Sequence, residues 1–266
     1  HQYIQTAIDK GAVAIVYEEE VETNQTSVQW IKVNNSAKAA GTIATNFYGD
    51  PSSKLKLVGI TGTNGKTSTA TLLHEVFTKL GYQVGLISTI KNIIGNKLIP
   101  STHTTPDCIA LNQLLAEMVE AGCSYCFMEV SSHAIDQSRI EGLKFTVAAF
   151  SNITHDHLDY HGDFKTYLYT KKRLFDQLQP GAFALTNKDD KNGMVMVQNC
   201  GAKVKTYSLY SMADFNAKII ENAFTGLVVQ IDGVEIHTKL VGEFNAYNLL
   251  AVYSIATVSY THLRAH

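Results

Sequence analysis

The chain has 266 residues and a formal net charge of −2 at pH 7, with 45% hydrophobic and 17% charged residues. This composition is typical of a globular protein and excludes a disordered one. A weakly acidic chain offers no broad basic field, so we expect no nucleic-acid partner. No apolar run reaches the roughly 20 residues that span a bilayer and no signal peptide opens the chain, so we expect no membrane partner and a cytoplasmic protein.

The first part of the chain predicts a small α/β unit. A helix (YIQTAIDKGA) is followed by a strand over residues 12–17, a second strand over 30–33 and a helix over 36–48. The stretch YGDPSS at 48–53 then concentrates turn-forming residues, as linkers do. We therefore expect a small N-terminal domain over residues 1–53 and a second domain over 54–257.

The second part predicts an α/β fold with a mainly parallel sheet flanked by helices. From residue 55 onward, strands rich in branched residues (LKLVGIT, YQVGLIS, SYCFMEV, FTVAAFSN, AFALTN) alternate with helical segments. Residues 217–240 change pattern, because short strands broken by Gly226 and by Asp232-Gly233 are typical of antiparallel hairpins. We place these hairpins at an antiparallel edge of the sheet.

The two ends of the sequence suggest a fragment. The chain begins at His1, without methionine, inside a predicted helix. At the other end, a helical pattern over 244–257 changes into VSYTHLRAH, which is less apolar and has no cap. We expect residues 258–266 to be a foreign or read-through tail.

Cys123 and Cys126 form a C-x-x-C motif, which could be a redox pair or half of a zinc site. The sequence has no second half-site, and the motif runs directly into an apolar strand. Free cysteine packs as a small hydrophobe, so we interpret both residues as buried thiols.

The stretch GITGTNGKTST at 59–69 is close to a phosphate-binding loop, but its spacing differs. The standard pattern has four residues between its glycines, whereas five separate Gly59 from Gly65 and two separate Gly62 from Gly65. The stretch follows a strand and precedes a helix, where glycines let backbone N–H groups face a phosphate. Lys66 could then reach the outer phosphates and Thr67 could offer a hydroxyl to magnesium. The alternative is a plain strand-to-helix turn.

Three later stretches carry further polar candidates. Glu129 ends the apolar strand YCFM, where an unpaired carboxylate would be costly, so it needs a cation unless it lies on the surface. THDHLDYHG, with His155, His157 and His161, could be a zinc cluster, but its spacing fits no strong zinc pattern, so we expect one ligand among shaping neighbours. YTKKRLF predicts the solvated basic face of a helix at Lys172 and Arg173.

Several of these motifs together resemble one protein family. GTNGKT at 62–67 is similar to the nucleotide loop of the Mur ligases, the ATP-dependent amino-acid ligases of peptidoglycan synthesis, and of the related folylpolyglutamate synthases. MEVSSH at 128–133, DHLDYHG at 156–162, STHTTPD at 101–107 and GEFNAYNLLA at 242–251 resemble the Mur ligases that add the third residue of the stem peptide. Folylpolyglutamate synthases resemble GTNGKGS in the loop and lack MEVSSH. The resemblance extends from the start to about residue 257. It implies that residues 1–53 are part of an N-terminal UDP-substrate-binding domain and that residues 54–257 are the central ATP-binding domain.

The resemblance implies ATP and two Mg²⁺ ions as cofactors. The nucleotide would contact the loop and a later helix, at Gly62, Thr63, Asn64, Gly65, Lys66, Thr67, Ser68, Asn245 and Asn248. An N-terminal cap would explain Asn245 equally well. Thr67 and Glu129 would hold one magnesium ion, and His157 with a carbamylated Lys171 the other, so that Lys66, His157 and Lys171 are the implied catalytic residues. A carbamate forms only on a lysine whose amine is partly neutral, which requires burial or a neighbouring cation.

The resemblance also implies an acceptor site for UDP-N-acetylmuramoyl-dipeptide. Its residues would be His103, Thr104, Thr105, Ser131, Gln137 and Arg139. Arg139 suits the acceptor's carboxylate, and His103 stands where relatives often have asparagine. Helix capping before Pro106 and Asp107 is the alternative for the two threonines, and both can hold together.

The implied reaction is amide synthesis. The D-glutamate carboxylate of the acceptor would attack the γ-phosphate of ATP, and an amine would displace phosphate from the acyl phosphate. The amine would be meso-diaminopimelate, which we favour, or L-lysine. The alternatives are another ligase of this superfamily and a nucleotide-binding module without catalysis. We expect a monomer that is inactive as this fragment, since the family continues into a third domain.

Overall fold

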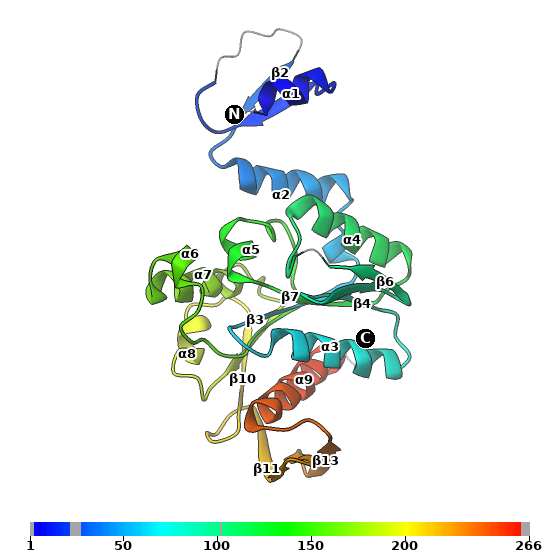
Figure 1. Ribbon diagram of the computed structural model, residues 1–266, viewed down its shortest axis with the longest axis vertical. Coiled ribbons are helices and arrows are strands. Elements are labelled where there is room, and N and C mark those ends of the chain that lie inside the picture. Colours follow the sequence, from blue (N-terminus) through cyan, green and yellow to red (C-terminus); the bar gives the residue numbers. More distant parts are fainter. Residues whose placement is uncertain (1–2, 22–27, 102, 262–266) are drawn as a thin grey trace.

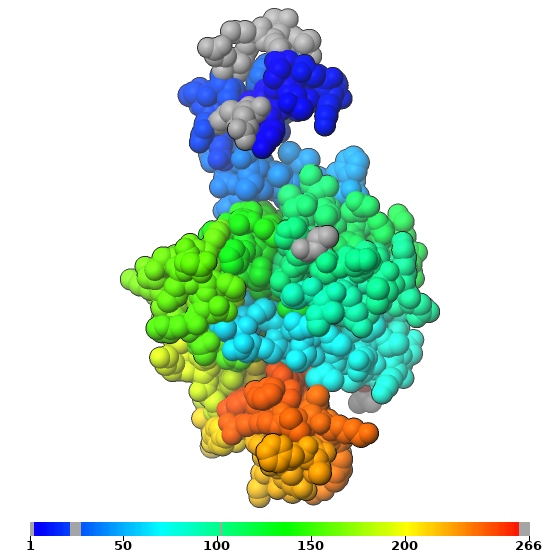
Figure 2. Space-filling model, in the orientation of Figure 1, coloured from blue at the N-terminus to red at the C-terminus, as the bar shows by residue number. Residues whose placement is uncertain are grey.

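The computed structural model describes residues 3–21, 28–101 and 103–261. Its N-terminal part stands out from a larger body (Figure 2). The elements of this part are α1 (Ile4–Asp9), β1 (Ala14–Tyr17), β2 (Gln29–Lys32) and α2 (Ser36–Phe47). β1 and β2 pair in parallel, and α2 begins where the Asn35 side chain accepts a hydrogen bond from the Lys38 N–H at 2.8 Å. The predicted order of helix, two strands and helix is confirmed.

The segment predicted as a linker packs against the larger body. Pro51 and Ser52 are buried in the short 3-10 helix η1 (Pro51–Ser53). The Ser52 hydroxyl accepts a hydrogen bond from the Lys144 N–H at 3.0 Å, and the Lys144 ammonium pairs with Asp50. This segment therefore ties α2 to the larger body, and the domain boundary at residue 53 stays a prediction.

The larger body is built on an eleven-stranded sheet in the order β13-β12-β11-β10-β9-β8-β3-β7-β4-β5-β6. Neighbouring strands are parallel from β4 through to β11, and both edges are antiparallel. The strands are β3 (Lys56–Thr61), β4 (Val84–Ile87), β5 (Lys91–Ile94), β6 (Lys97–Pro100), β7 (Tyr125–Glu129), β8 (Val147–Phe150), β9 (Phe183–Asn187), β10 (Lys203–Ser208), β11 (Phe215–Ala223), β12 (Gly226–Ile231) and β13 (Val234–Thr238).

Helices cover both faces of this sheet (Figure 1). They are α3 (Lys66–Lys79), α4 (Cys108–Glu120), α5 (Ser132–Asp136), α6 (Leu158–His161), α7 (Phe164–Asp176), α8 (Gly193–Met196) and α9 (Glu243–Thr261). One buried cluster contains Leu111 of α4 and Phe175 of α7, and the other contains Phe77 of α3 and Leu250 of α9. Because the central strands are buried on both faces, they read as continuous apolar runs. The predicted α/β fold is confirmed.

The structure differs from the sequence prediction in three strands that were missed and in the end of one helix. Residues 91–100 form a second antiparallel edge, β5 and β6, where no strands were predicted, and β10 was also missed. Helix α9 continues to Thr261 instead of ending at residue 257, because Val258 is still buried against the sheet. Residues 262–266 of the predicted tail lie outside the described residues, and the tail's origin stays a prediction.

The cysteine interpretation is confirmed. Cys123 and Cys126 are buried free thiols, and burial raises the pKa of the Cys126 thiol far above its ordinary value. None of the helices formed by the described residues is long and apolar enough to cross a bilayer.

Candidate active site

The candidate site lies where the central parallel strands end. β3 runs between β7 and β8, so that Ile60 is paired with Glu129 and Thr61 with Phe150. The carboxyl ends of parallel strands meet at one edge of the sheet, and ligands of α/β proteins bind at that edge. The loop after β3 therefore emerges beside the last residue of β7.

Two glycines let this loop pack closely. Gly62 has φ +146°, and a Cβ there would lie 2.0 Å from the Ser151 hydroxyl oxygen. Gly65 has φ +86°, and a Cβ there would lie 2.5 Å from Oδ1 of Asn248. The unusual glycine spacing of the motif therefore serves a tight loop that is seated between the end of β8 and helix α9.

Residues after β8 hold the loop backbone. Asn152 accepts from the Thr63 N–H through its carbonyl at 2.8 Å and from the Asn64 N–H through Oδ1 at 3.0 Å. The Ser151 hydroxyl donates to the Asn64 carbonyl at 2.7 Å. Sequence reasoning missed both residues, and their only signal was a Ser-Asn pair directly after an apolar strand.

Two lysines converge on the loop. Lys66 Nζ donates to the carbonyls of Gly62 and Thr63 at 2.9 and 2.7 Å. Lys171 Nζ, on α7, donates to the same Gly62 carbonyl at 3.1 Å and lies 4.7 Å from the centre of the Tyr167 ring. The Lys171 residue is only 1% exposed.

Burial lowers the pKa of both lysines. Burial, and then the positive charge of Lys66, hold the pKa of Lys171 well below its ordinary value, against an opposing effect of Asp156. Burial also lowers the pKa of Lys66, and the charges of Glu129 and Asp156 oppose that change. Desolvation disfavours the charged form of an amine, so Lys171 is the more readily neutralised of the two.

Glu129 ends β7 as predicted and is 1% exposed, so the alternative of a surface glutamate is wrong. Thr89, just after β4, holds both carboxylate oxygens. Its N–H donates to Oε1 at 2.9 Å and its hydroxyl lies 3.2 Å from Oε2. Thr89 is a site residue that sequence reasoning missed.

The histidine-rich stretch contains residues with separate surroundings. His157 precedes α6 at φ +53° and lies edge-on to His133, with 5.0 Å between ring centres. His161 is buried with Nε2 3.0 Å from the Ser132 hydroxyl, whereas His155 stacks on Phe164. Over residues 3–21, 28–101 and 103–261, no three His, Cys, Asp or Glu side chains are grouped to hold a metal ion. The zinc-cluster alternative therefore has no support.

The solvated basic face predicted on α7 is wrong at Lys172. This residue is buried, and its ammonium donates to the Asp176 carboxylate and, at 2.8 Å, to the Gln198 carbonyl. Arg173 lies at the surface and pairs with Asp136 at 3.4 Å.

A cavity of about 430 Å³ brings together most residues predicted for the metal ions and the acceptor. These are Lys66, Thr67, His103, Thr104, Thr105, Glu129, Ser131, Arg139, His157 and Lys171. Gln137 lines a neighbouring cavity of about 290 Å³ with His103 and Arg139. We call the larger cavity the acceptor cavity.

Hydrogen bonds fix the walls of the acceptor cavity. Thr105 donates its hydroxyl to the Glu129 carbonyl at 2.8 Å and accepts from the Ser131 N–H at 3.2 Å. Arg139 donates to the Thr105 carbonyl at 2.8 Å and to Gln137 Oε1. The cap of α4 is Asp107, which accepts from the N–H groups of residues 109 and 110, so the capping alternative for the two threonines is wrong.

A second cavity of about 640 Å³ contains predicted nucleotide-binding residues, and we call it the nucleotide cavity. Asn64, Gly65, Ser68 and Asn248 line it. Asn245 is inside α9 rather than at its cap, and its Oδ1 accepts from Asn248 Nδ2 at 3.1 Å. Asn245 therefore orients Asn248, and the capping alternative is wrong.

Sequence reasoning missed the far wall of the nucleotide cavity. Tyr247 of α9 lines it and donates its hydroxyl to Asp189 Oδ2 at 3.0 Å. Asp189, after β9, also accepts from the Ser208 hydroxyl and the Leu209 N–H, both at 2.7 Å. The residues come from three distant segments that only the sheet brings together.

The donors present fit one magnesium ion directly. The Glu129 carboxylate and the Thr67 hydroxyl face the same cavity, and Mg²⁺ in phosphoryl-transfer sites is held by one or two protein oxygens together with phosphates and water. His157 and an unmodified Lys171 do not make a second site, because neither the ammonium nor the neutral amine of lysine supplies the oxygen ligand that Mg²⁺ prefers.

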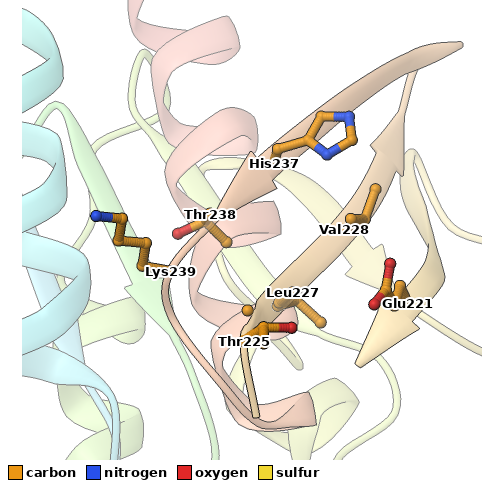
Figure 3. A pocket seen from close by; sticks show the side chains of 8 residues that line it. Glu221, Thr225, Leu227, Val228, His237, Thr238 and Lys239 are labelled. Atoms are coloured by element: carbon orange, nitrogen blue, oxygen red, sulfur yellow. The ribbon is translucent and has the colours of Figure 1, made fainter. Parts of the chain in front are cut away.

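A further hollow lies at the edge of the sheet farthest from this chemistry. Side chains of β11, β12 and β13 line it, among them Glu221, Leu227 and His237 (Figure 3). Five strands separate β13 from β3 in the sheet order β13-β12-β11-β10-β9-β8-β3, and none of the predicted site residues lines the hollow.

Comparison with known proteins gives three findings. Residues 60–256 match the family description "Mur ligase middle domain". The chain is 57% identical over 259 residues to the UDP-N-acetylmuramoyl-L-alanyl-D-glutamate–2,6-diaminopimelate ligase of Cytophaga hutchinsonii, covering 97% of this chain and 53% of the relative. A solved structure of a ligase of the same name superposes with a TM-score of 0.85 at 26% identity, over 97% of this chain and 54% of that one.

A more distant structure shows the fold alone. The MurF ligase of Thermotoga maritima in complex with ADP has a TM-score of 0.63 at 19% identity, over 97% of this chain and 56% of that chain. The chain thus spans about half the length of the proteins it matches.

Proposed function

Since the chain belongs to the Mur ligase family through its middle domain, we propose that it forms the ATP-binding core of a UDP-N-acetylmuramoyl-L-alanyl-D-glutamate–diaminopimelate ligase. The observation that carries the proposal is the position of Lys66 and Lys171 on the Gly62 carbonyl. Both amines thereby contact the loop at 62–68, whose residues line both the nucleotide cavity and the acceptor cavity.

ATP is the nucleotide we propose. Its phosphates would lie along residues 62–68, where the loop leads into the N-terminus of α3, and its base would enter the nucleotide cavity beside Asn248 and Tyr247. The ADP bound by the Thermotoga maritima ligase supports an adenine nucleotide.

Magnesium is the metal we propose, held by Glu129 and Thr67 and, after modification of Lys171, by His157 and the Lys171 carbamate. When bound, these ions neutralise the charge that develops on the transferring phosphoryl group. Lys171 supports the modification because its amine is buried and its pKa is lowered. Addition of CO₂ to the neutral amine would form a C–N bond and release one proton, which converts a cation into an oxygen ligand.

The acceptor would lie in the acceptor cavity, with Thr104, Thr105, Ser131 and Arg139 on its walls. Arg139 has its guanidinium oriented by the Thr105 carbonyl and Gln137, which leaves it suited to a carboxylate of the dipeptide. His103 and Gln137 would contact the acceptor from the adjoining cavity.

The reaction follows from this arrangement. The D-glutamate carboxylate attacks the γ-phosphorus of ATP, ADP leaves, and an acyl phosphate forms. The amine of diaminopimelate then attacks the acyl carbon, and inorganic phosphate and a proton leave as the amide forms. Lys66 stabilises the charge on the phosphoryl oxygens. The diaminopimelate ligases among the relatives support this amine over L-lysine.

We further propose that the protein acts as a monomer in the cytoplasm, and that residues 1–266 alone do not complete the reaction, because the matched relatives are about twice as long. Another ligase of the superfamily, or a nucleotide-binding module, remains the alternative.

The test is phosphate release from ATP by the longest natural protein that contains these residues, which we call the long-form protein. The proposal requires release that depends on both the UDP-linked dipeptide and diaminopimelate. Phosphate release with L-lysine in place of diaminopimelate would mean that L-lysine is the amine substrate. Release that depends on neither the dipeptide nor the amine would contradict the proposed ligase activity.

A further inference from the structure

The Thr89 side chain contacts both Glu129 and Thr104, a residue that lines the acceptor cavity. Its hydroxyl oxygen lies 3.2 Å from Glu129 Oε2 and 3.1 Å from the hydroxyl oxygen of Thr104. Both Thr89 and Thr104 line the acceptor cavity. The Thr89 hydroxyl thus links the Thr104 hydroxyl, in the acceptor cavity, to the buried carboxylate of Glu129.

The turn after β4 holds Thr89 in place. Ile87, at the end of β4, pairs with Met128 of β7, which places Thr89 beside the end of β7. The Ser88 hydroxyl donates to the Lys91 carbonyl at 2.7 Å, and the Ser88 N–H donates to Asn92 Oδ1 at 3.3 Å. Since the turn is bonded to β5 in this way, the Thr89 N–H is directed at Glu129 before any ligand binds.

Thr89 also leaves part of the carboxylate open. An ionised carboxylate has about four lone-pair positions, and Thr89 uses one on each oxygen. With both oxygens held, the plane of the carboxylate cannot rotate freely, and Glu129 lines the cavity that Thr67 and Lys66 also line.

The Thr89 hydroxyl is the donor in both contacts, to Glu129 Oε2 and to the hydroxyl oxygen of Thr104. A threonine hydroxyl carries one proton, so Thr89 can donate to only one of these two oxygens at a time. The Glu129 carboxylate is the stronger acceptor because it is charged, and Thr104 competes with it for the Thr89 proton. A ligand that engages the Thr104 hydroxyl therefore changes the hydrogen bond at Glu129.

From these contacts we infer that Thr89 is a positioning residue that orients the Glu129 carboxylate for a metal–nucleotide complex and couples it to acceptor binding at Thr104. The inference rests on the proposed function for the identity of the acceptor. The contact with Glu129 does not depend on that identity.

The test compares Thr89→Val, which removes the hydroxyl and keeps the backbone N–H, with Thr89→Ser, which keeps both. Thr78→Val is the matched control, since Thr78 is a surface threonine whose hydroxyl donates to the carbonyl of His74 on its own helix. The long-form proteins are titrated with Mn²⁺ and the methylene analogue of ATP, and free Mn²⁺ is followed by electron paramagnetic resonance, with and without the UDP-linked dipeptide.

We expect Thr89→Val to weaken Mn²⁺ binding about tenfold or more, the effect of one hydrogen bond to a charged group. The dipeptide should change the Mn²⁺ affinity of the wild type and of Thr89→Ser, and leave that of Thr89→Val unchanged. Thr78→Val should match the wild type in both titrations.

Mn²⁺ affinity and dipeptide response that are equal in Thr89→Val and the wild type would overturn the inference. This failure differs from failure of the proposed function, in which the wild type releases no phosphate that depends on the dipeptide. The titration without dipeptide tests Thr89 in that case too, and equal thermal unfolding of the variants separates positioning from damage to the fold.

Discussion

The side-chain amines of Lys66 and Lys171 donate to a single acceptor, the backbone carbonyl of Gly62, at 2.9 and 3.1 Å. Two cations on one carbonyl repel each other, and burial adds to that cost, so the site favours the loss of one proton. The pKa of Lys171 is lowered further than that of Lys66, because Lys171 is almost fully buried and lies near the positive charge of Lys66. We therefore expect Lys66 to act as a cation and Lys171 to react as an amine.

The first prediction is a carbamate on Lys171. Wild-type protein equilibrated with ¹³C-bicarbonate should show a carbamate carbon signal in its NMR spectrum, and Lys171→Met should lack it. Lys172→Met is the matched control, because Lys172 is also buried but its ammonium is paired with Asp176 and donates to the Gln198 carbonyl. If Lys172→Met lost the signal and Lys171→Met kept it, the carbamate would lie on Lys172, which would contradict the prediction.

A second prediction concerns the loop glycines. Gly65 and Gly81 have φ +86° and +89°, but only Gly65 faces a close neighbour, Asn248, and nothing lies within 4 Å of a Cβ at Gly81. Both alanine variants should lose roughly 1–2 kcal/mol of unfolding free energy through the left-handed backbone. Gly65→Ala should lose more, and should also weaken binding of the ATP analogue in calorimetry. Equal losses of unfolding free energy in the two variants, with unchanged binding of the ATP analogue by Gly65→Ala, would mean that the contact with Asn248 affects neither stability nor nucleotide binding.

A third prediction concerns Asp189 and pH. Burial works to raise the pKa of its carboxyl group, but hydrogen bonds from Ser208, Leu209 and Tyr247 outweigh burial and lower the pKa below its ordinary value. A carboxylate with a lowered pKa in the folded state adds stability above the unfolded-state pKa, and this stability is lost as pH falls through the folded-state value.

Asp189→Asn should therefore cost about 1–3 kcal/mol at pH 7, because an amide N–H₂ would face donors. In urea unfolding, the difference from wild type should shrink as pH falls below the ordinary Asp pKa of about 3.9 and through the lower folded-state value of Asp189. Asp232→Asn is the control at an exposed site that accepts from the Tyr253 hydroxyl, and it should cost less than about 1 kcal/mol. A loss of stability in Asp189→Asn that does not change with pH would contradict the lowered pKa of the Asp189 carboxyl group.

A fourth prediction separates function from stability at Glu129. Glu129→Gln keeps the shape of the side chain and an oxygen for the Thr89 N–H, but removes the buried charge. The unfolding free energy should fall by no more than about 1 kcal/mol, since Thr89 keeps an oxygen to donate to and burying the charge of Glu129 is itself costly. Phosphate release by the long-form protein should fall about 100-fold or more. A large loss of stability with near-normal phosphate release would make Glu129 a structural residue.

The sequence predicted the site residues whose position follows from a local pattern, and missed those whose contacts come from distant strands. The loop at 59–69 and Glu129 were predicted because local pattern places them, at the end of an apolar strand and before a helix. Thr89 and Asn152 were missed, because their roles arise only from the order of β4, β7, β3 and β8 in the sheet. Parallel pairing of distant strands leaves no local pattern in a single sequence.

The fold shows the same limit. Alternating strands and helices predicted the parallel core, and Gly226 with Asp232-Gly233 predicted the hairpins at one edge. The opposite edge, β5 and β6, was missed because residues 91–100 offer only two four-residue strands around Gly95. Lys172 was misread because a buried ammonium paired with a carboxylate one helical turn away has the same sequence pattern as a solvated pair.

The most direct test of the proposed site is a crystal structure of the long-form protein with Mg²⁺ and the methylene analogue of ATP. We expect a magnesium ion about 2.0–2.1 Å from oxygens of Glu129 and Thr67, with the γ-phosphate beside Lys66 and Lys171 and the base next to Asn248. A triphosphate bound outside the loop at 62–68, or a metal ion that leaves Glu129 without contact, would contradict it.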